Sequence, residues 1–507
     1  MLNLTASVSY HAKRAPDRVA IIYDDEVISY GELYHRVTRM ASLLHAKGIG
    51  QNDVVAMFMK NSPAFVEIAL AISYVGAVFL PINFRLAAGE AEHILKDAGA
   101  KLLFMDEEFA RLKTLGFMKI IVGAVAQGDS RHLVPDDLPA PYPVQRSEND
   151  LMRLMYTSGT TSRPKGVMHT YGNFYWKSFD HIIALSLTCD QRLLVVGPLY
   201  HVGAFDLPGM AVMLVGGSLV LHRDFDPEQV LASIERHKIT CGWMAPVMLS
   251  RVLATDNPGR FDLSSFQWCI AGGEKTPEVR IRDFTRVFSD GRFIDGFGMT
   301  ETCSGDTLME PGREFDKIGS VGRALAHVEI RIVDSKGMTL PPNTQGEICV
   351  RGPKVTKGYW NAPDKTAESF FDDWLRTGDI GVLDDEGFLF ITDRAKDMIL
   401  TGAENVASCE VEGVIYELDQ VAEAAVIGVP DVEWGERIVA AVVPNPDADL
   451  TYEQLRDHCR AQLAGFKVPR ELHIFEQLPR NPSGKILKRR LREDLQERSR
   501  GNETGEQ

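Results

Sequence analysis

The chain alternates short apolar runs with longer stretches of helical periodicity. Apolar residues recur at i, i+3 and i+4 over 31–47 and 64–75, which predicts helices. Residues 18–30 have the pattern of a β-hairpin. Further helices are expected at 88–97, 226–237 and 276–288. Short strands are expected at 101–105, 119–122, 192–196, 217–221, 266–270 and 292–295. Strands that alternate with helices in this way predict an α/β fold of open, layered sheets.

The pattern changes after residue 328. Short runs at 328–333, 346–350 and 388–391 predict an antiparallel sheet or small barrel that closes the large domain. A charged break at 393–397 precedes a helix, two strands and a helix at 408–418, 422–429, 437–443 and 451–463, an α+β unit of roughly a hundred residues. We therefore expect an N-terminal domain over 1–393, a hinge at 394–398, a C-terminal domain over 399–495 and a polar tail at 496–507.

One loop, 156–166, has no core-forming side chain after its first residue. An apolar run at 151–155 leads into it, and strand-like residues 167–169 leave it. Its backbone N–H groups, hydroxyls and Lys165 are suited to a polyphosphate, because such turns converge donors and charge on an anion. The spacing is not that of a Walker loop, and a flexible polar surface loop is the alternative interpretation.

Composition narrows the class of protein. A length of 507 residues exceeds one ordinary core, and 45% hydrophobic and 25% charged residues are typical of a globular protein. A formal net charge of −15 argues against a nucleic-acid partner. Seven scattered cysteines without metal spacing favour reduced, mostly buried thiols and a cytoplasmic location. There is no signal-peptide pattern, and the longest apolar stretch, 210–221, is too short to span a bilayer. A homodimer is left open.

With its loops taken in order, the chain resembles the adenylate-forming superfamily, which comprises acyl-CoA synthetases, luciferases and peptide-synthetase adenylation domains. The resemblance covers nearly the whole length and rests on 156–166, 198–201, 296–301, 376–379, 393–405 and 481–485. It implies a large N-terminal domain of layered α/β subdomains with a small antiparallel barrel-like subdomain, and a small mobile α+β C-terminal domain. Taken alone, 296–298 is also compatible with half of a dinucleotide loop.

The resemblance implies an acid–thiol ligase that uses ATP, Mg²⁺ and coenzyme A. A carboxylate oxygen attacks the α-phosphorus of ATP and pyrophosphate leaves; coenzyme A then displaces AMP. Such displacement depends on positioning and charge neutralisation. The residues that the resemblance makes catalytic are Lys485, Thr300, Glu301 and His201.

The implied nucleotide contacts come from several loops. Thr300 would touch the α-phosphate, Glu301 would hold Mg²⁺, and Asp379 would accept both ribose hydroxyls, with Arg394 nearby. Two of these residues also have a purely structural interpretation: Glu301 as an ordinary carboxylate at the start of a helix, and Asp379 as a residue that forms a turn. The remaining contacts are Thr157, Ser158, Gly159, Thr160, Thr161 and Lys165 on the β- and γ-phosphates, Gly272, Gly273 and Glu274 beside the adenine, Gly296, Phe297, Gly298 and Met299, and Lys485. Phe297 replaces a common tyrosine, so stacking on the adenine is expected without a phenolic hydrogen bond.

The C-terminal part carries the coenzyme A expectations. Lys396 stands at the implied hinge, Gly402 and Ala403 would line the pantetheine tunnel, and Trp434 and Lys467 are weaker candidates. The family's Tyr-Pro pair is replaced at 407–409, which we interpret as a helix-cap variation around Ser408. The basic run 488–490 is interpreted as a solvated helix start.

The acyl pocket is expected behind His201, and none of its residues is cationic, so a second substrate carboxylate would be left unpaired. Its expected lining is His201, Phe205, Gly209, Trp243, Met244, Ala245, Gly273 and Met299. Tryptophan and methionine suggest a hydrophobic acid, and Gly209 suggests depth. This favours a medium- or long-chain fatty acid; an aryl acid such as a cinnamate or benzoate is the alternative. A fatty-acyl-AMP ligase that loads a carrier protein, a luciferase-like oxygenase and a non-catalytic nucleotide-binding module remain as rival functions.

Overall fold

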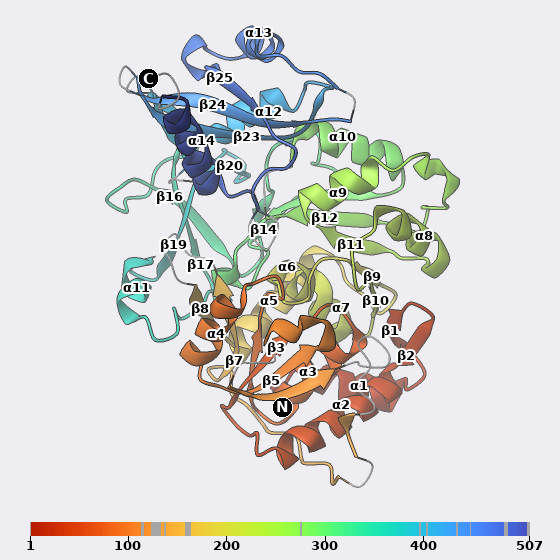
Figure 1. The fold of residues 1–507 in the computed structure, drawn as a ribbon. Helices are drawn as coiled ribbons and strands as arrows, with labels where there is room; N and C mark the ends of the chain where they lie inside the picture. Colours follow the sequence, from red (N-terminus) through yellow and green to blue (C-terminus); the bar gives the residue numbers. More distant parts are fainter. Residues whose placement is uncertain are drawn as a thin grey trace.

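The computed structural model describes residues 2–112, 116–122, 133–135, 138–157, 164–273, 276–394, 397–401, 404–431, 434–446, 448–480 and 485–503. Two large sheets with helices between and outside them form the middle and lower part of Figure 1; the smaller antiparallel sheet lies at the left, and the C-terminal sheet lies at the top. The α/β class and the layered arrangement expected from the sequence are confirmed.

The larger sheet has nine strands with a parallel centre. In spatial order they are β15 (Arg323–Ala324), β14 (Thr307–Leu308), β13 (Arg292–Phe297), β12 (Trp268–Gly272), β11 (Cys241–Met244), β9 (Arg192–Val195), β10 (Ser218–Leu221), β1 (Val19–Tyr23) and β2 (Glu26–Ser29). The hairpin expected at 18–30 is the antiparallel pair β1–β2.

The second sheet has six strands and ends in the antiparallel pair that flanks the loop 156–166. Its order is β6 (Met118–Val122), β5 (Ala100–Asp106), β3 (Val54–Phe58), β4 (Val78–Pro81), β7 (Leu151–Thr157) and β8 (Lys165–Thr170).

Helices fill three layers around these sheets. Those between the sheets bury apolar side chains in one central cluster, and α3 is buried at every residue, so it is apolar on all sides. The central helices are α1 (Thr5–Arg14), α2 (Tyr30–Ala46), α3 (Pro63–Tyr74), α5 (Tyr171–Ala184), α6 (Val202–Ala204) and α7 (Met210–Val215). The outer helices are α4 (Ala88–Asp97), α8 (Pro227–His237), α9 (Pro246–Leu253) and α10 (Glu278–Val287). Asp226 caps α8 by accepting from the Gln229 amide at 2.8 Å, with Pro227 at the first position as expected.

The third sheet is antiparallel and contains β16 (Glu329–Val333), β17 (Gly346–Arg351), β18 (Phe370–Phe371), β19 (Trp374–Leu383) and β20 (Leu389–Arg394). The short helix α11 (Pro363–Glu368) lies in its β17–β18 connection. This sheet confirms the antiparallel unit expected after residue 328.

The last sheet follows β20 without a long connection. It contains β21 (Ile399–Thr401), β22 (Glu404–Val406), β23 (Val421–Asp431), β24 (Gly435–Pro444) and β25 (Glu471–Ile474). Helices α12 (Ser408–Ile415) and α13 (Tyr452–Gln462) cover one face, and α14 (Lys488–Glu503) packs Leu491 and Leu495 on the other. Figure 1 shows this blue unit above the green strands β12 and β14 of the largest sheet.

Candidate active site

The strands β12 and β13 end side by side, with Gly272 paired to Gly296. A Cβ on Gly272 would lie 3.0 Å from the Gly296 carbonyl oxygen, so glycine permits this close approach. Just beyond β13, a 3₁₀ turn over Thr300–Thr302 presents Thr300 and Glu301 at the same edge. Ligands bind at the carboxyl ends of parallel strands in open α/β sheets, so this edge is the candidate active site.

Glu301 is a buried carboxylate, only 8% exposed, and the Tyr359 hydroxyl donates to its Oε1 at 2.9 Å. Burial raises the pKa of Glu301, while the Tyr359 hydrogen bond and the charges of Lys485 and Lys165 oppose that rise. Lys165 Nζ lies 5.1 Å from the centroid of the Tyr359 ring. Tyr359 therefore stands between two expected site residues, although the sequence interpretation missed it; the aromatic pair that follows Gly358 was the available signal.

Lys485 reaches this edge from the C-terminal sheet. Its Cε lies 3.8 Å from the position that a Cβ on Gly273 would occupy, and Gly273 has a left-handed backbone with φ +98°. The lysine is close enough to lower the pKa values of both Glu301 and His201. The structure thus brings Lys485, Glu301 and His201 together from three distant segments.

The two residues expected at the ribose lie on the neighbouring antiparallel strands β19 and β20 of the third sheet. Asp379 pairs with Arg394 across β19 and β20, and the Arg394 Nε atom lies 3.3 Å from Asp379 Oδ1. Gly378 precedes the aspartate with φ +72°, a conformation that favours glycine. Both residues lie inside β19 and not at a turn, so the turn-former interpretation is wrong, and Asp379 is held by strand pairing and by the ion pair with Arg394.

The ends of the loop 156–166 are described, and its centre is not. Thr157 closes β7 opposite Lys165 at the start of β8. Expected site residues outside the described ranges are Ser158, Gly159, Thr160, Thr161, Glu274, Lys396, Gly402 and Ala403.

Glu301 fits a role as a magnesium ligand because its buried carboxylate gains from an added cation. Among the described residues, no group of three or more His, Cys, Asp or Glu side chains is placed to hold a metal. A single carboxylate of this kind suits Mg²⁺, which is commonly held by one or two carboxylates together with substrate phosphates.

His201 faces the strand β11 through Trp243, their ring centroids being 6.3 Å apart. The Gly203 amide donates to His201 Nδ1 at 3.0 Å, so Nε2 carries the proton of the neutral ring. Burial, with help from Lys485, lowers the pKa of His201 to about 4. The imidazole is therefore a neutral donor at neutral pH.

Several residues expected to line the acyl pocket lie elsewhere or have another explanation. Met244 packs in the cluster on the opposite face of β11 from Trp243, because neighbouring strand residues alternate. A Cβ on Gly209 would lie 2.5 Å from the Ala204 carbonyl oxygen, so backbone packing explains that glycine without a deep pocket. Phe205 packs against Phe79 in the central core, with ring centroids 5.6 Å apart.

Of the other residues expected to line the acyl pocket or to contact adenine, some lie in the central core and others are only half-buried. Trp243 is 8% exposed and lies so close to Gly197 and Gly203 that any side chain there would overlap its indole. Phe297 is also in the central core, and its 7% exposure leaves little ring surface for stacking on adenine. Ala245 precedes α9, and Ala245, Gly298 and Met299 are half-buried.

Two interpretations of the C-terminal part are corrected. Ser408 is the first residue of α12 and not its cap: its hydroxyl donates to Asp393 Oδ2 at 2.7 Å. Lys488 is not solvated, because its Nζ pairs with Glu412 at 2.7 Å and only 15% of its side chain is exposed. The other two basic residues, Arg489 and Arg490, are exposed as expected.

The two weaker coenzyme A candidates already have partners. Arg470 lies 4.0 Å over the Trp434 ring, and Lys467 Nζ donates to Glu410 Oε1 at 2.6 Å. Both lie on the C-terminal unit. A role with coenzyme A would require these contacts to be exchanged.

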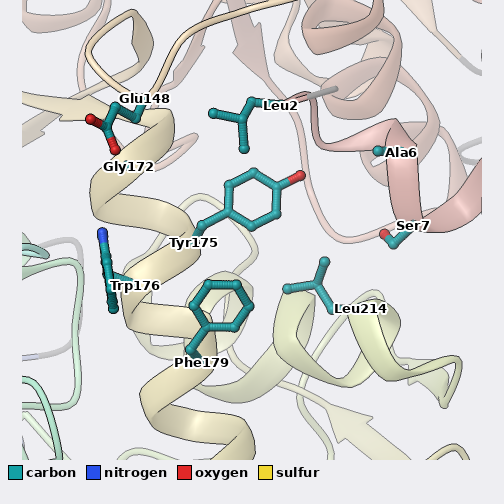
Figure 2. Close-up of a pocket in the computed structure, with 9 residues that line it drawn as sticks. All are labelled: Leu2, Ala6, Ser7, Glu148, Gly172, Tyr175, Trp176, Phe179 and Leu214. Carbon is teal, nitrogen blue, oxygen red and sulfur yellow. The ribbon is translucent and has the colours of Figure 1, made fainter.

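A separate apolar pocket of about 430 Å³ lies between α1, α5 and α7 and contains none of the expected site residues. Figure 2 shows the Tyr175 and Phe179 rings of α5 facing Leu2 and Leu214 across it. No described helix is long and apolar enough to cross a membrane. All seven cysteines are free thiols, and Cys241, Cys269, Cys303, Cys349 and Cys459 are buried.

The fold, the strand-end site and the lysine that enters it from a second unit define a class of nucleotide-dependent enzymes. Models of two families match the chain: the AMP-binding enzyme family over residues 8–360 and the AMP-binding enzyme C-terminal domain over residues 410–485. The chain therefore belongs to the AMP-binding enzymes, which confirms the resemblance drawn from its motifs.

Named relatives cover almost the whole chain. It is 37% identical to a feruloyl-CoA synthase of Amycolatopsis over 95% of this chain and 96% of that one. It is 34% identical to a long-chain-fatty-acid–CoA ligase of Mycobacterium tuberculosis over 92% and 93% of the two chains. Among solved structures, the o-succinylbenzoate CoA synthetase of Bacillus subtilis with ATP and a magnesium ion matches with a TM-score of 0.85 at 31% identity, covering 96% of this chain and 98% of that one.

Proposed function

We propose that this protein is an ATP-dependent acid–CoA ligase that forms an acyl-adenylate and then an acyl-CoA. The observation that carries the proposal is the convergence of Lys485, Glu301 and His201 on the edge formed by β12 and β13. Relatives that act on acids and coenzyme A, and a neighbour that binds ATP and magnesium, support the same activity.

In the first step, a substrate carboxylate oxygen bonds to the α-phosphorus of ATP, and the bond from that phosphorus to the bridging oxygen breaks. Pyrophosphate leaves. Lys485 and Thr300 would stabilise charge on the α-phosphate, and Lys165 would bind the departing phosphates. Glu301 would hold Mg²⁺, which neutralises phosphate charge when bound.

In the second step, the sulfur of coenzyme A bonds to the acyl carbonyl carbon, and the bond from that carbon to the AMP oxygen breaks. AMP leaves and the thiol proton is released. A free thiol of pKa about 8.5 is only about 3% thiolate at pH 7, so placement of the thiol matters. We propose that the part after residues 394–398 reorients between the steps.

We propose a hydrophobic acid as substrate, in the first place a medium- or long-chain fatty acid. The apolar packing around Trp243 supports it, as does the likeness to a long-chain-fatty-acid–CoA ligase. An aryl acid is the second candidate: the nearly parallel His201 and Trp243 rings, inclined by 28°, suit a flat ring, and a feruloyl-CoA synthase is 37% identical.

A panel of acids tests the proposal. Fatty acids from C2 to C18, benzoate, cinnamates and malonate are each incubated with ATP and coenzyme A, and the release of AMP and acyl-CoA is measured. A hydrophobic acid should give AMP and thioester in equal amounts. Adenylate without thioester would instead support loading of a carrier protein, and a response to malonate alone would contradict the hydrophobic site.

A further inference from the structure

A cluster of charged side chains lies buried between the two large sheets, away from solvent and outside the expected site. Arg153 of β7, Lys177 of α5 and Asp206 of the π-helical segment Phe205–Gly209 are each completely buried. Arg153 Nη2 lies 2.8 Å from Asp206 Oδ2, and Lys177 Nζ lies 3.2 Å from Asp206 Oδ1. Apolar replacements of such clusters are often as stable or more so, so stability alone does not account for it.

The cluster fixes the proton of a neighbouring imidazole. Arg153 donates to His169 Nδ1 from Nε at 3.1 Å and from Nη2 at 2.8 Å. Because a guanidinium only donates, Nδ1 is the acceptor and His169 Nε2 carries the proton. Burial and the charge of Arg153 lower the pKa of His169 to about 3, so the ring stays neutral.

The proton on His169 is directed at the candidate active site. His169 Nε2 donates to the Thr300 carbonyl oxygen at 2.6 Å. A second contact runs parallel to it: the Thr356 amide donates to the Glu301 carbonyl at 2.7 Å, and the Thr356 hydroxyl donates to the Met168 carbonyl at 2.6 Å. The strand β8, which begins at Lys165, is thus joined to the turn that carries Thr300 and Glu301.

The other end of the cluster is joined to the segment of His201. Asp206 follows the three-residue helix α6, which His201 caps. Its main-chain carbonyl accepts from Lys177 Nζ at 3.3 Å and lies 3.2 Å from His181 Nδ1. Both the side chain and the main chain of Asp206 are therefore held in place.

We propose that His169 is a positioning residue for the adenylation step. Asp206 anchors Arg153, and Arg153 holds His169. His169 in turn fixes Thr300 relative to Lys165 and to the His201 segment. The inference rests on the proposed function, because it assigns Thr300 to the α-phosphate. A misplacement of about 1 Å at a reacting centre costs about 100-fold in rate, so a fixed carbonyl behind Thr300 has a large effect.

A comparison of the variants His169→Leu and His169→Gln tests the proposal. Leucine removes both hydrogen bonds, whereas glutamine accepts from Arg153 through its oxygen and donates to Thr300 through its nitrogen. Acid-dependent exchange of pyrophosphate into ATP measures adenylation, and thioester formation from supplied acyl-AMP measures the second step. We expect His169→Leu to lower the kcat of exchange about 10- to 100-fold with a small change in KM for ATP. Thioester formation should stay within about threefold, and His169→Gln should recover most of the exchange.

The matched control is His222→Leu, because His222 is a half-buried imidazole that bonds Ser233 Oγ at 2.8 Å and follows β10 of the other large sheet. It should lower the melting temperature without changing exchange per folded enzyme. If His169→Leu behaves like this control, slows both steps equally, or is not rescued by glutamine, the proposal is wrong. Wild-type enzyme that exchanges with no acid would refute the proposed function instead.

A second variant keeps the test decisive if His169→Leu does not fold. Arg153→Met leaves Asp206 paired one to one with Lys177, so it removes a buried cation without stranding the carboxylate. It should slow exchange several-fold and spare thioester formation. Added to His169→Gln, it should cost less than the product of the two separate effects, because Arg153 acts through residue 169. If the effects of the two substitutions on exchange simply multiply, Arg153 does not act through residue 169, and the proposed chain of contacts is wrong.

Discussion

The two lysines expected to act on ATP are held in opposite ways. Lys165 begins β8, is paired with Thr157 across the strand, and lies over the Tyr359 ring, all within the large layered part. Lys485 lies between β25 and α14 of the C-terminal sheet and reaches Gly273 across the boundary between the two parts. Lys165 is therefore held by residues before 394, whereas Lys485 reaches the site from the C-terminal unit, and we propose that its presence there depends on the placement of that unit.

The strongest test of this difference is Lys485→Ala. We expect adenylation to fall about 10²- to 10³-fold, because a charge that acts on the transition state is removed. ATP binding and thioester formation from supplied acyl-AMP should persist. Exchange and thioester assays on one preparation measure both, and normal acid-dependent release of pyrophosphate would refute the role of Lys485.

The pH dependence of the free energy of unfolding should also show that the buried imidazole of His169 is neutral in the folded protein. The pKa of His169 is about 3 in the folded protein and about 6.5 when unfolded, so the unfolded state takes up the proton first as pH falls. The stabilisation is complete above pH 6.5 and is lost as pH falls towards 3. Between pH 7 and pH 5, wild type should lose about 2 kcal/mol more free energy of unfolding than His169→Gln. Urea unfolding at both pH values measures this; equal losses would mean that the pKa of His169 in the folded protein is not lowered.

A smaller change is expected from Lys165→Ala. The lysine should contribute mainly to binding, so the KM for ATP should rise about tenfold while kcat changes less, since a binding charge that is lost equally from ground and transition states leaves kcat intact. Steady-state kinetics with varied ATP separate the two. A loss confined to kcat would make Lys165 resemble Lys485 and remove the contrast.

The smallest effect concerns a contact between α12 of the C-terminal unit and Asp393 of β20. Ser408→Ala removes the hydroxyl bond to Asp393 and the acceptor of a Lys488 Nζ hydrogen bond, but the Ser408 amide, which donates to Asp393 Oδ2 at 2.6 Å, remains. Because Lys488 keeps its ion pair with Glu412, the net loss should be about 1 kcal/mol, so adenylation should fall no more than about fivefold. If the ratio of the adenylation rate to the thioester-formation rate is unchanged, this contact does not favour the placement of the C-terminal part in which Lys485 reaches the site.

Local patterns predicted much of the architecture because they are short-range. The hairpin at 18–30, the cap at Asp226 and the antiparallel unit after residue 328 all follow from periodicity and turn chemistry within a few residues. The same reasoning gave a wrong role to Ser408 and a wrong environment to Lys488. Both errors come from partners that are distant in sequence, Asp393 and Glu412.

The sequence by itself determined the class of protein, since loop chemistry, motif order and apolar periodicity are properties of local composition. Only the tertiary structure decided which charged groups meet. Arg153 and His169 face each other across the antiparallel pair β7–β8, but nothing near them in the chain indicates that Asp206 joins them, because the segment after α6 reaches them only when the two sheets pack. Tyr359 and Lys485 reach Glu301 for the same reason: the burial that brings them close is a property of the assembled layers.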